Sequence, residues 1–349
     1  MGVRLDEEFA VAAHRTKQLG GRFLRIVLQC CQLECMSKDN PHGRLARHGA
    51  TPQGFSPYRC HFVDCAVCDA LLQILPLRAL SNLHAVIRTT TSDAGVTTIT
   101  LDRPEAKNAL TVEMRDDLVA AVRDARADPA VRAILITGTG DAFCTGMDLR
   151  ASTVVQAGGE GFNTRSTSEA LRIGVQAVIR ELWELDKPTV AAVNGTAVGP
   201  GAHLALACDF VFVHDETRFA WTFARWGLVV DAGGAYLLPR LVGLPRAKAM
   251  VMLGEGAKGQ EAVDLGLAYK CVPADELRAE AEALAERLAT GPTRSLGLSK
   301  QLLNRTFETY LAAALELEGQ FQSLATTSSD LAEGMAAFKE KRDPRFTGR

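Results

Sequence analysis

Three short, largely apolar runs alternate with helical segments in this chain, and this alternation limits the fold more than any other feature. The runs are VRAILITGTG (131–140), KPTVAAVNG (187–195) and DFVFVH (209–214). Runs of this kind are typical of strands that are buried on both faces of a sheet. The helical segments between them supply the crossovers that connect such strands. The sequence therefore predicts an α/β fold.

The segment before the first run contains a further strand and a helix. GVTTITLDRP (95–104) alternates as a strand does, and Pro104 ends it because proline has no backbone N–H to donate. Residues 111–128 repeat apolar side chains at helical spacing. Thr111 is placed to cap this helix, and Pro129 lies just beyond its end.

Composition divides the chain into three parts. Six of the nine cysteines precede residue 70, and residues 1–88 carry 11 Lys and Arg against 7 Asp and Glu. We expect residues 1–88 to be a poorly ordered extension, 89–273 to be the core domain and 274–349 to be helical. Within the core we expect a polar, Gly-rich loop over 151–168, followed by a helix through Trp183.

The cysteines of the extension have a spacing that has two explanations. Cys60, Cys65 and Cys68 are spaced like part of an iron–sulfur ligand run, and His61 offers an extra ligand. Because no fourth cysteine lies at a matching distance, we expect free thiols and no metal.

Charge and hydropathy exclude several classes of partner. The formal net charge is −2, so no basic field would gather nucleic acid or anionic lipid. No stretch approaches twenty uninterrupted apolar residues, and the early acidic run Asp6, Glu7 and Glu8 is unlike a targeting leader. We expect a soluble, cytoplasmic protein without a nucleic-acid or membrane partner.

Two glycine-containing stretches, GDAFCTGMDL (140–149) and NGTAVGPGAHLALACD (194–209), follow predicted strands. Glycines at 146, 199 and 201 would let a ligand approach the backbone, where two N–H groups can hold a carbonyl oxygen or an enolate. The alternative is that these glycines only make tight turns. A dinucleotide site at GTGDAF is disfavoured because no helix opens after it and the third glycine is missing.

From about Val96 to Arg349, the chain resembles the enoyl-CoA hydratase/isomerase (crotonase) superfamily. The matching stretches, in order, are ITLDRPEAKNAL, VRAILITGTGDAFCTGMDL, KPTVAAVNGTAVGPGAHLALACDFVFV, GLVVDAGGAYLLPRLVG, EAVDLGLAYKCV and EGMAAFKEKRDPRF. The resemblance implies an α/β fold made of a crotonase-like spiral of ββα units, with a helical C-terminal trimerisation region. It also implies an acyl-CoA substrate and a homotrimer or a dimer of trimers. We expect no separate cofactor, because coenzyme A enters as part of the substrate.

The resemblance also implies an oxyanion hole, a pair of backbone N–H groups that hold the thioester oxygen. One donor is Met147, and the other aligns with Pro200, which has no N–H. We expect Gly201 to supply the second donor; the alternative is that this donor is missing.

The acid/base residues depart from the hydratase pattern. Two glutamates of hydratases are replaced here by His203 and Phe223, and phenylalanine cannot move a proton. Asp231 resembles the single acid/base of isomerase-type members, and its apolar neighbours should raise its pKa. The alternatives are that Asp231 caps a helix opening at Gly233 and Gly234, and that His203 is a satisfied wall residue rather than a catalytic one.

Further residues are assigned by the resemblance to coenzyme A binding, with ordinary surface or interface roles as the alternative. They are Ala106, Lys107, Ala109, Gly146, Asp148, Leu149 and Arg150, with Phe338 and Lys341 reaching a neighbouring subunit's coenzyme. Trp221, Arg225 and Trp226 are expected to line or support the acyl pocket, or else to pack in the core.

The sequence therefore favours an enoyl-CoA isomerase that uses Asp231. One alternative is an enoyl-CoA hydratase that uses His203, Asp231 or both with a water molecule. The other, suggested by Phe223 and Pro200, is a non-catalytic acyl-CoA-binding member of the fold.

Overall fold

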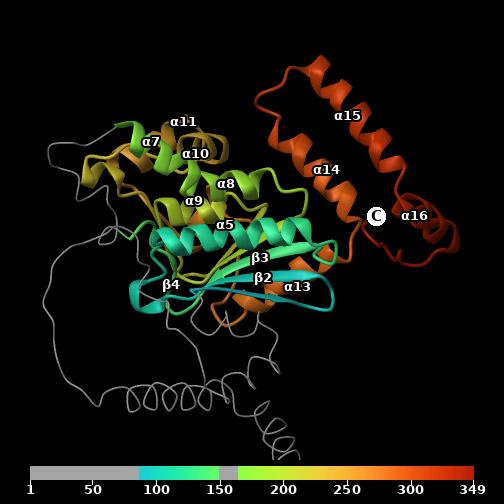
Figure 1. Cartoon of the computed structure of the whole chain (residues 1–349), viewed down its shortest axis with the longest axis horizontal. Coiled ribbons are helices and arrows are strands. Elements are labelled where there is room, and N and C mark those ends of the chain that lie inside the picture. The colour runs from blue at the N-terminus through green and yellow to red at the C-terminus, as the bar shows by residue number, and fades with distance from the viewer. Residues whose placement is uncertain (1–85, 149–163) are drawn as a thin grey trace, which may run out of the picture. The chain divides into compact units, whose positions relative to one another are not determined.

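A computed structural model describes residues 86–148 and 164–349, which contain two β-sheets (Figure 1). The larger sheet has the order β1 (Ile87–Thr91), β2 (Val96–Leu101), β3 (Ala133–Gly138), β5 (Thr189–Val193), β7 (Phe210–Val213) and β10 (Lys270–Cys271). The smaller sheet has the order β4 (Ala142–Cys144), β6 (Thr196–Val198), β8 (Arg218–Ala220) and β9 (Ala257–Lys258). All pairs are parallel except β1 with β2 and β8 with β9.

The described residues also form eleven α-helices, of which α14 to α16 extend away from the sheets (Figure 1). They are α5 (Val112–Ala127), α7 (Thr164–Ile173), α8 (Val175–Trp183), α9 (Pro200–Leu206), α10 (Gly234–Val242), α11 (Leu244–Lys248), α12 (Gly259–Asp264), α13 (Leu277–Ala289), α14 (Thr293–Asn304), α15 (Leu311–Thr326) and α16 (Ser329–Glu340). Short helical turns are η1 (Pro104–Ala106), η2 (Phe223–Trp226) and the π-helical η3 (Ala249–Leu253).

From β3 to β8, successive strands alternate between the two sheets. The chain passes from β3 to β4, from β5 to β6 and from β7 to β8, and a helical segment follows each pair. This repeat is the spiral of ββα units that the sequence predicts, so the predicted α/β fold is confirmed.

The larger sheet is buried on both faces, as the apolar runs predict. Ile134 and Ile136 of β3 pack in a cluster with α5, whereas Ala133 and Leu135 point to the opposite face. There they pack against α13, which lies across the sheet from α5 (Figure 1). Alternate side chains of one strand therefore serve two cores.

Helix α5 also forms as predicted. The Thr111 hydroxyl caps its first turn by accepting a hydrogen bond from the Met114 N–H at 3.2 Å. Leu118 and Val122 are fully buried, and the helix ends at Ala127.

The segment between β4 and β5 differs from its prediction. A helix was expected only after residue 168, but α7 begins at Thr164; residues 149–163 lie outside the described residues. Instead of one helix through Trp183, two helices meet at Gly174. A Cβ on Gly174 would overlap the Ala170 carbonyl oxygen and the Arg115 guanidinium, so only glycine fits at this junction.

The limits of the compact unit also differ from those expected. The unit runs from Ala85 to Arg349, and β1 crosses the boundary expected between residues 88 and 89. Helix α13 packs on the larger sheet, so the core continues to Ala289. The predicted helical tail is otherwise present as α14 to α16. The cysteines at 60, 65 and 68 lie outside the described residues.

No helix among residues 86–148 and 164–349 has the length and apolar character needed to cross a membrane.

Candidate active site

The two glycine-containing stretches meet where β4 and β6 end. These strands pair in parallel, with Ala142 opposite Thr196 and Cys144 opposite Ala197. A Cβ on Gly146 would lie 3.0 Å from the Val198 carbonyl oxygen. A Cβ on Gly201 would overlap the Cys144 carbonyl oxygen. The backbones are therefore in direct contact, and their N–H groups open at the same edge of the sheet.

The N–H of Met147 is directed away from its neighbouring strand segment. Met147 forms a parallel bridge with Leu110, in which the Leu110 N–H donates to the Gly146 oxygen at 2.8 Å and the Asp148 N–H donates to the Leu110 oxygen at 2.9 Å. This pattern leaves the Met147 N–H on the other side. It has no hydrogen-bond partner among the described residues.

The N-terminus of α9 supplies further N–H groups at the same edge. Gly199 precedes the helix with φ 51°, and its N–H donates to the Ala220 oxygen at 2.9 Å. Pro200 is the first helical residue and cannot donate. The N–H groups of Gly201 and Ala202 have no partner in the described part of the chain, as is usual in a first helical turn. This geometry is compatible with the predicted donor at Gly201.

Arg103, which sequence reasoning missed, braces this edge. Its guanidinium lies 2.7 Å from the Asp148 carboxylate and also donates to the Ala109 oxygen at 2.9 Å. The pair is largely buried, with side-chain exposures of 22% and 10%. It fixes the residue that follows Met147.

Two asparagines, also missed, hold the turn that leads into β4. Asn108 and Asn194 both donate to the Ala142 oxygen, at 2.8 and 3.2 Å. Asn108 is fully buried with φ 55° and also donates to the Thr139 oxygen at 2.9 Å. These bonds orient β4 and hence the N–H groups that follow it.

His203 lies completely buried behind this edge. Its Nε2 accepts a hydrogen bond from the Trp221 indole N–H at 3.0 Å, and its ring stacks on Phe223 with centroids 5.9 Å apart. Burial lowers the pKa of His203 to about 4, so the ring is neutral near pH 7. With Nε2 engaged, the geometry favours the wall-residue alternative over proton transfer.

Asp231 lies half-buried between η2 and α10. Burial raises its pKa to about 6, as the sequence predicts. Its Oδ1 is buried and accepts no hydrogen bond from the described residues. The capping alternative is not supported, because Gly233 is the N-cap of α10 and no side chain bonds to the first turn. A free carboxylate oxygen with a raised pKa is suited to act as a general base.

Close contacts connect the turn after Asp231 to the N-terminus of α9. A Cβ on Gly199 would lie 3.3 Å from Cζ of Phe223, the residue that stacks on His203. A Cβ on Gly234 would overlap the His203 ring. The order of contact is thus Gly199, Phe223, His203 and the turn after Asp231.

The predicted coenzyme A residues of the first loop and of the β4 end are also brought together. The Thr145 N–H donates to the Lys107 oxygen at 3.2 Å, and the Arg103 contacts above join Ala109 to Asp148. Ala106 is the last residue of η1, directly before Lys107. Leu149 and Arg150 lie outside the described residues.

Helix α16 lies apart from α9 and α10 in Figure 1. It carries Phe338, which is 86% exposed, and is followed directly by Lys341. A single chain therefore does not bring these two residues to the site.

The three residues expected near the acyl pocket divide between core and surface. Trp221 is fully buried and belongs to the core, whereas Arg225 is exposed and Trp226 is 63% exposed.

Comparison with known proteins identifies the family to which this chain is similar. A family model described as enoyl-CoA hydratase/isomerase matches residues 91–349. A 1,2-epoxyphenylacetyl-CoA isomerase of Escherichia coli (strain K12) is 37% identical over 263 residues, which cover 74% of this chain and 97% of that protein. A Rhodobacter capsulatus protein named as a probable enoyl-CoA hydratase is 40% identical over 255 residues, covering 73% and 95%. The crystal structure of an enoyl-CoA hydratase from Polaromonas sp. JS666 has a TM-score of 0.69 at 32% identity, covering 74% of this chain and 99% of that chain.

Proposed function

The chain belongs to the enoyl-CoA hydratase/isomerase family of the crotonase superfamily, and we propose that it is an enoyl-CoA isomerase. In the proposed reaction Asp231 removes a proton from C2 of a 3-enoyl thioester, and the electron pair passes through an enolate. The protonated Asp231 returns the proton to C4, so that the double bond moves to C2–C3. No atom is gained or lost.

The observation that carries this proposal is the Asp231 carboxylate, which has an oxygen unpaired among the described residues and lies just before the turn that packs on the His203 ring. Asp231 has a free Oδ1 and a pKa of about 6, whereas the positions of the two hydratase glutamates hold His203 and Phe223, stacked on each other. Moving a proton between two carbons needs one base. Adding water needs a group that activates the water as well.

The proposed oxyanion hole consists of the N–H groups of Met147 and Gly201. Both are without partners among the described residues and lie at the ends of paired strands. A preorganised donor at a developing oxyanion contributes roughly 10²- to 10³-fold in rate. The thioester oxygen between these groups would therefore make C2 acidic enough for a carboxylate to act.

We place the coenzyme A part of the substrate against two loops. One contributes Ala106, Lys107 and Ala109, and the other runs from Gly146 to Arg150. The Lys107 side chain is 61% exposed and, among the described residues, forms only an exposed pair with Asp141 at 3.8 Å, so it can reach a phosphate of the coenzyme. Coenzyme A enters as substrate, so the proposal includes no separate cofactor. The proposed location is the cytoplasm.

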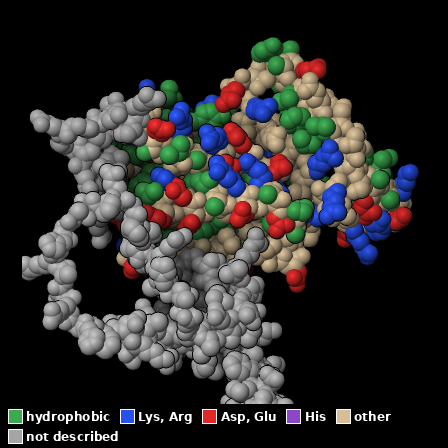
Figure 2. Space-filling view, in the orientation of Figure 1, with side chains coloured by type: hydrophobic (Ala, Val, Ile, Leu, Met, Phe, Trp, Pro, Cys, Tyr) green, Lys and Arg blue, Asp and Glu red, His purple; other side chains and the backbone are tan. Residues whose placement is uncertain are grey.

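We also propose that the protein is a homotrimer or a dimer of trimers that associates through its C-terminal helices. Helix α15 has 16 residues and none of them is buried in the single chain. Hydrophobic side chains lie exposed over α14 to α16 and the segment that connects α14 with α15 (Figure 2). They include Leu303, Phe307, Tyr310, Leu311, Leu315, Met335 and Phe338. Apolar surface of this extent favours association.

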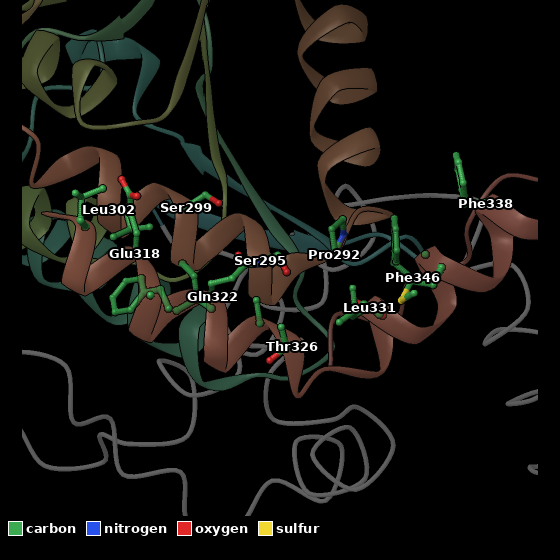
Figure 3. A pocket seen from close by; sticks show the side chains of 18 of the residues that line it. Pro292, Ser295, Ser299, Leu302, Glu318, Gln322, Thr326, Leu331, Phe338 and Phe346 are labelled. Atoms are coloured by element: carbon green, nitrogen blue, oxygen red, sulfur yellow. The ribbon is translucent and has the colours of Figure 1, made fainter.

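A groove between these helices marks the proposed contact. Its volume is about 970 Å³, and side chains from α14 and α15 line its walls (Figure 3). Leu302, Leu315 and Leu331 contribute apolar surface to it. We propose that a second copy of the chain covers this groove, which would also bring Phe338 and Lys341 to the neighbour's coenzyme.

The experiment that tests the isomerase proposal is incubation with a 3-enoyl-CoA, followed by measurement of the conjugated 2-enoyl thioester. We expect turnover by the wild type and a loss of about 10²- to 10⁴-fold in kcat with Asp231→Asn, because the variant has no base. Full activity of Asp231→Asn would remove this residue from the mechanism.

Hydratase activity is the second candidate, because relatives with hydratase names match this chain closely. Mass analysis after incubation with crotonyl-CoA distinguishes the two reactions. A product heavier by one water would support hydration, and an unchanged substrate supports the isomerase. Thermal stabilisation by acyl-CoA without turnover of either thioester would indicate the non-catalytic alternative.

A further inference from the structure

We infer that His203 is a positioning residue for Asp231, acting through the turn that carries this carboxylate, and that Trp221 fixes the tautomer in which it does so. This inference rests on the proposed function, because it assumes that Asp231 is the base. It gives His203 a role in the reaction without proton transfer by the imidazole.

Three side-chain or backbone contacts fix the plane of the His203 ring. Nε2 accepts the Trp221 indole N–H at 3.0 Å, and Phe223 stacks nearly parallel, with an angle of 7° between the rings. The backbone of Gly234 packs so closely on the ring that a Cβ there would overlap Cε1 and Nε2. The imidazole therefore rests directly against the first residue of α10.

The Trp221 contact decides where the ring carries its proton. An indole N–H only donates, so Nε2 of His203 must be the acceptor. In a neutral imidazole the hydrogen then lies on Nδ1. Nδ1 is buried and makes no hydrogen bond of normal geometry with the described residues. The structure thus holds a donor, unpaired in the described part of the chain, on a ring that packs against the turn after Asp231.

A backbone group of Asp231 influences the charge of the His203 ring. It raises the pKa of His203, against the larger lowering by burial. No charged side chain in the described part of the chain contributes to the shift of either His203 or Asp231. The His203 ring also packs directly on the backbone of Gly234, so the turn is supported by a backbone contact for which a neutral ring is sufficient.

The turn itself needs such support. Ala232 has φ 46° and Gly233 has φ 78°, and the Gly234 N–H closes the turn on the Asp231 oxygen at 2.9 Å. The left-handed conformation is unfavourable for alanine and persists only where the surroundings hold it. The His203 ring contacts this turn, so its loss would let the carboxylate move. A misplacement of about 1 Å at a reacting group costs about 10²-fold in rate.

The test compares His203→Phe, His203→Gln and Trp221→Phe in turnover of a 3-enoyl-CoA. We expect His203→Phe to lower kcat about 10- to 100-fold while KM stays within about 3-fold, because substrate binding does not depend on the turn. Trp221→Phe should lower kcat in the same way by a smaller factor. His203→Gln should recover most of kcat, because the amide offers both an acceptor for Trp221 and a donor for the turn. His214→Gln is the control, since His214 lies after β7 and bonds locally to Glu216.

A second measurement determines which nitrogen of the His203 ring carries the proton, without any turnover of substrate. Nitrogen NMR of histidine-labelled protein should show a neutral ring with its proton on Nδ1 between about pH 5 and pH 8. In Trp221→Phe the ring should lose this tautomer. This measurement also decides the case in which His203→Phe does not fold.

Several outcomes would overturn the inference. Wild-type kcat in His203→Phe would do so, and so would a His203→Gln variant as impaired as His203→Phe, which would assign proton transfer to the imidazole. A ring that carries its proton on Nε2, or is charged at pH 6, would also contradict it. Asp231→Asn is measured in parallel: if that variant keeps full activity, the proposed function fails, whereas normal His203 variants beside an inactive Asp231→Asn refute only this inference.

Discussion

The Arg103 guanidinium lies 2.7 Å from the Asp148 carboxylate and joins the first loop to the residue that follows the proposed Met147 donor. The two residues are 45 positions apart in the sequence. Because the same guanidinium also binds the Ala109 oxygen, one side chain connects both of the loops proposed to hold coenzyme A.

Replacement of Arg103 by methionine should therefore affect both stability and catalysis. We expect a loss of about 1–3 kcal/mol in the free energy of unfolding, because the mostly buried Asp148 carboxylate loses its ion pair with Arg103. The freed loop should lower kcat/KM about 10- to 100-fold. Denaturant titration and steady-state kinetics measure the two effects.

Lys107→Ala is the comparison for Arg103→Met. Lys107 forms an exposed pair with Asp141 at 3.8 Å, and such pairs contribute little to stability. We expect a change of less than about 0.5 kcal/mol in the free energy of unfolding and a raised KM. Equal effects of the two substitutions on stability would contradict the role given to Arg103.

Pro200→Ala tests the second oxyanion donor by adding an N–H at residue 200. If Gly201 already supplies that donor, kcat/KM should change by less than about 3-fold, because another N–H adds little to a complete site. A rise of about 10²-fold would show that the wild type lacks its second donor. Kinetics with a 3-enoyl-CoA distinguish the two results.

The pH dependence of kcat/KM should report Asp231. A general base acts only when it is deprotonated, so activity should fall as the pH is lowered through about 6, the pKa to which burial raises this carboxyl. His203, with a pKa of about 4, stays neutral across this range and therefore does not change kcat/KM there. An acid limb near the ordinary carboxyl value of 3.8 would contradict this assignment.

Asp231→Asn should stabilise the protein at alkaline pH. The carboxyl has a higher pKa in the folded protein than the ordinary value of 3.8, so the folded state binds this proton more tightly. The resulting stability is complete below pH 3.8 and is lost as the pH rises through about 6. We expect the variant to gain about 1–2 kcal/mol over the wild type near pH 8, allowing for solvent screening, and almost nothing near pH 4. A gain that does not depend on pH would refute the explanation.

Leu315→Glu tests the proposed assembly through the C-terminal helices. Leu315 is 55% exposed in the single chain and lines the groove that a second copy is proposed to cover. A carboxylate there should weaken association, which light scattering after size-exclusion chromatography measures. Gln320→Glu, an exposed change on the same helix, is the control. An unchanged oligomer in Leu315→Glu would place the interface elsewhere.

The sequence predicts the larger sheet well because its strands have a strong local signal. In β3 every residue from Ala133 to Thr137 is buried, which is what an uninterrupted apolar run implies. Helix α5 is equally well predicted, because its capping residue and its apolar spacing both lie within 18 residues of sequence.

The smaller sheet has no such signal. Strands β4, β6 and β8 have three residues each, too few to show an alternating pattern. They form because each pairs with another short strand at the edge of the site.

The long-range contacts that stabilise the site were missed for a related reason. Asn108 bonds to the Thr139 oxygen 31 positions away, and the bond from Trp221 to His203 spans 18. No local pattern encodes such contacts, so only the folded chain reveals them. The close backbone approach at Gly146 and Gly201, in contrast, could be predicted from the local sequence.

The strand order of the larger sheet has a consequence for synthesis. Its strands follow one another across the sheet in the order in which they occur in the chain, from β1 to β10. A chain leaving the ribosome can thus extend the sheet at one advancing edge, pairing each new strand with the one made before it. No strand has to be inserted between two that are already paired. Assembly can therefore proceed in the direction of translation without undoing earlier steps.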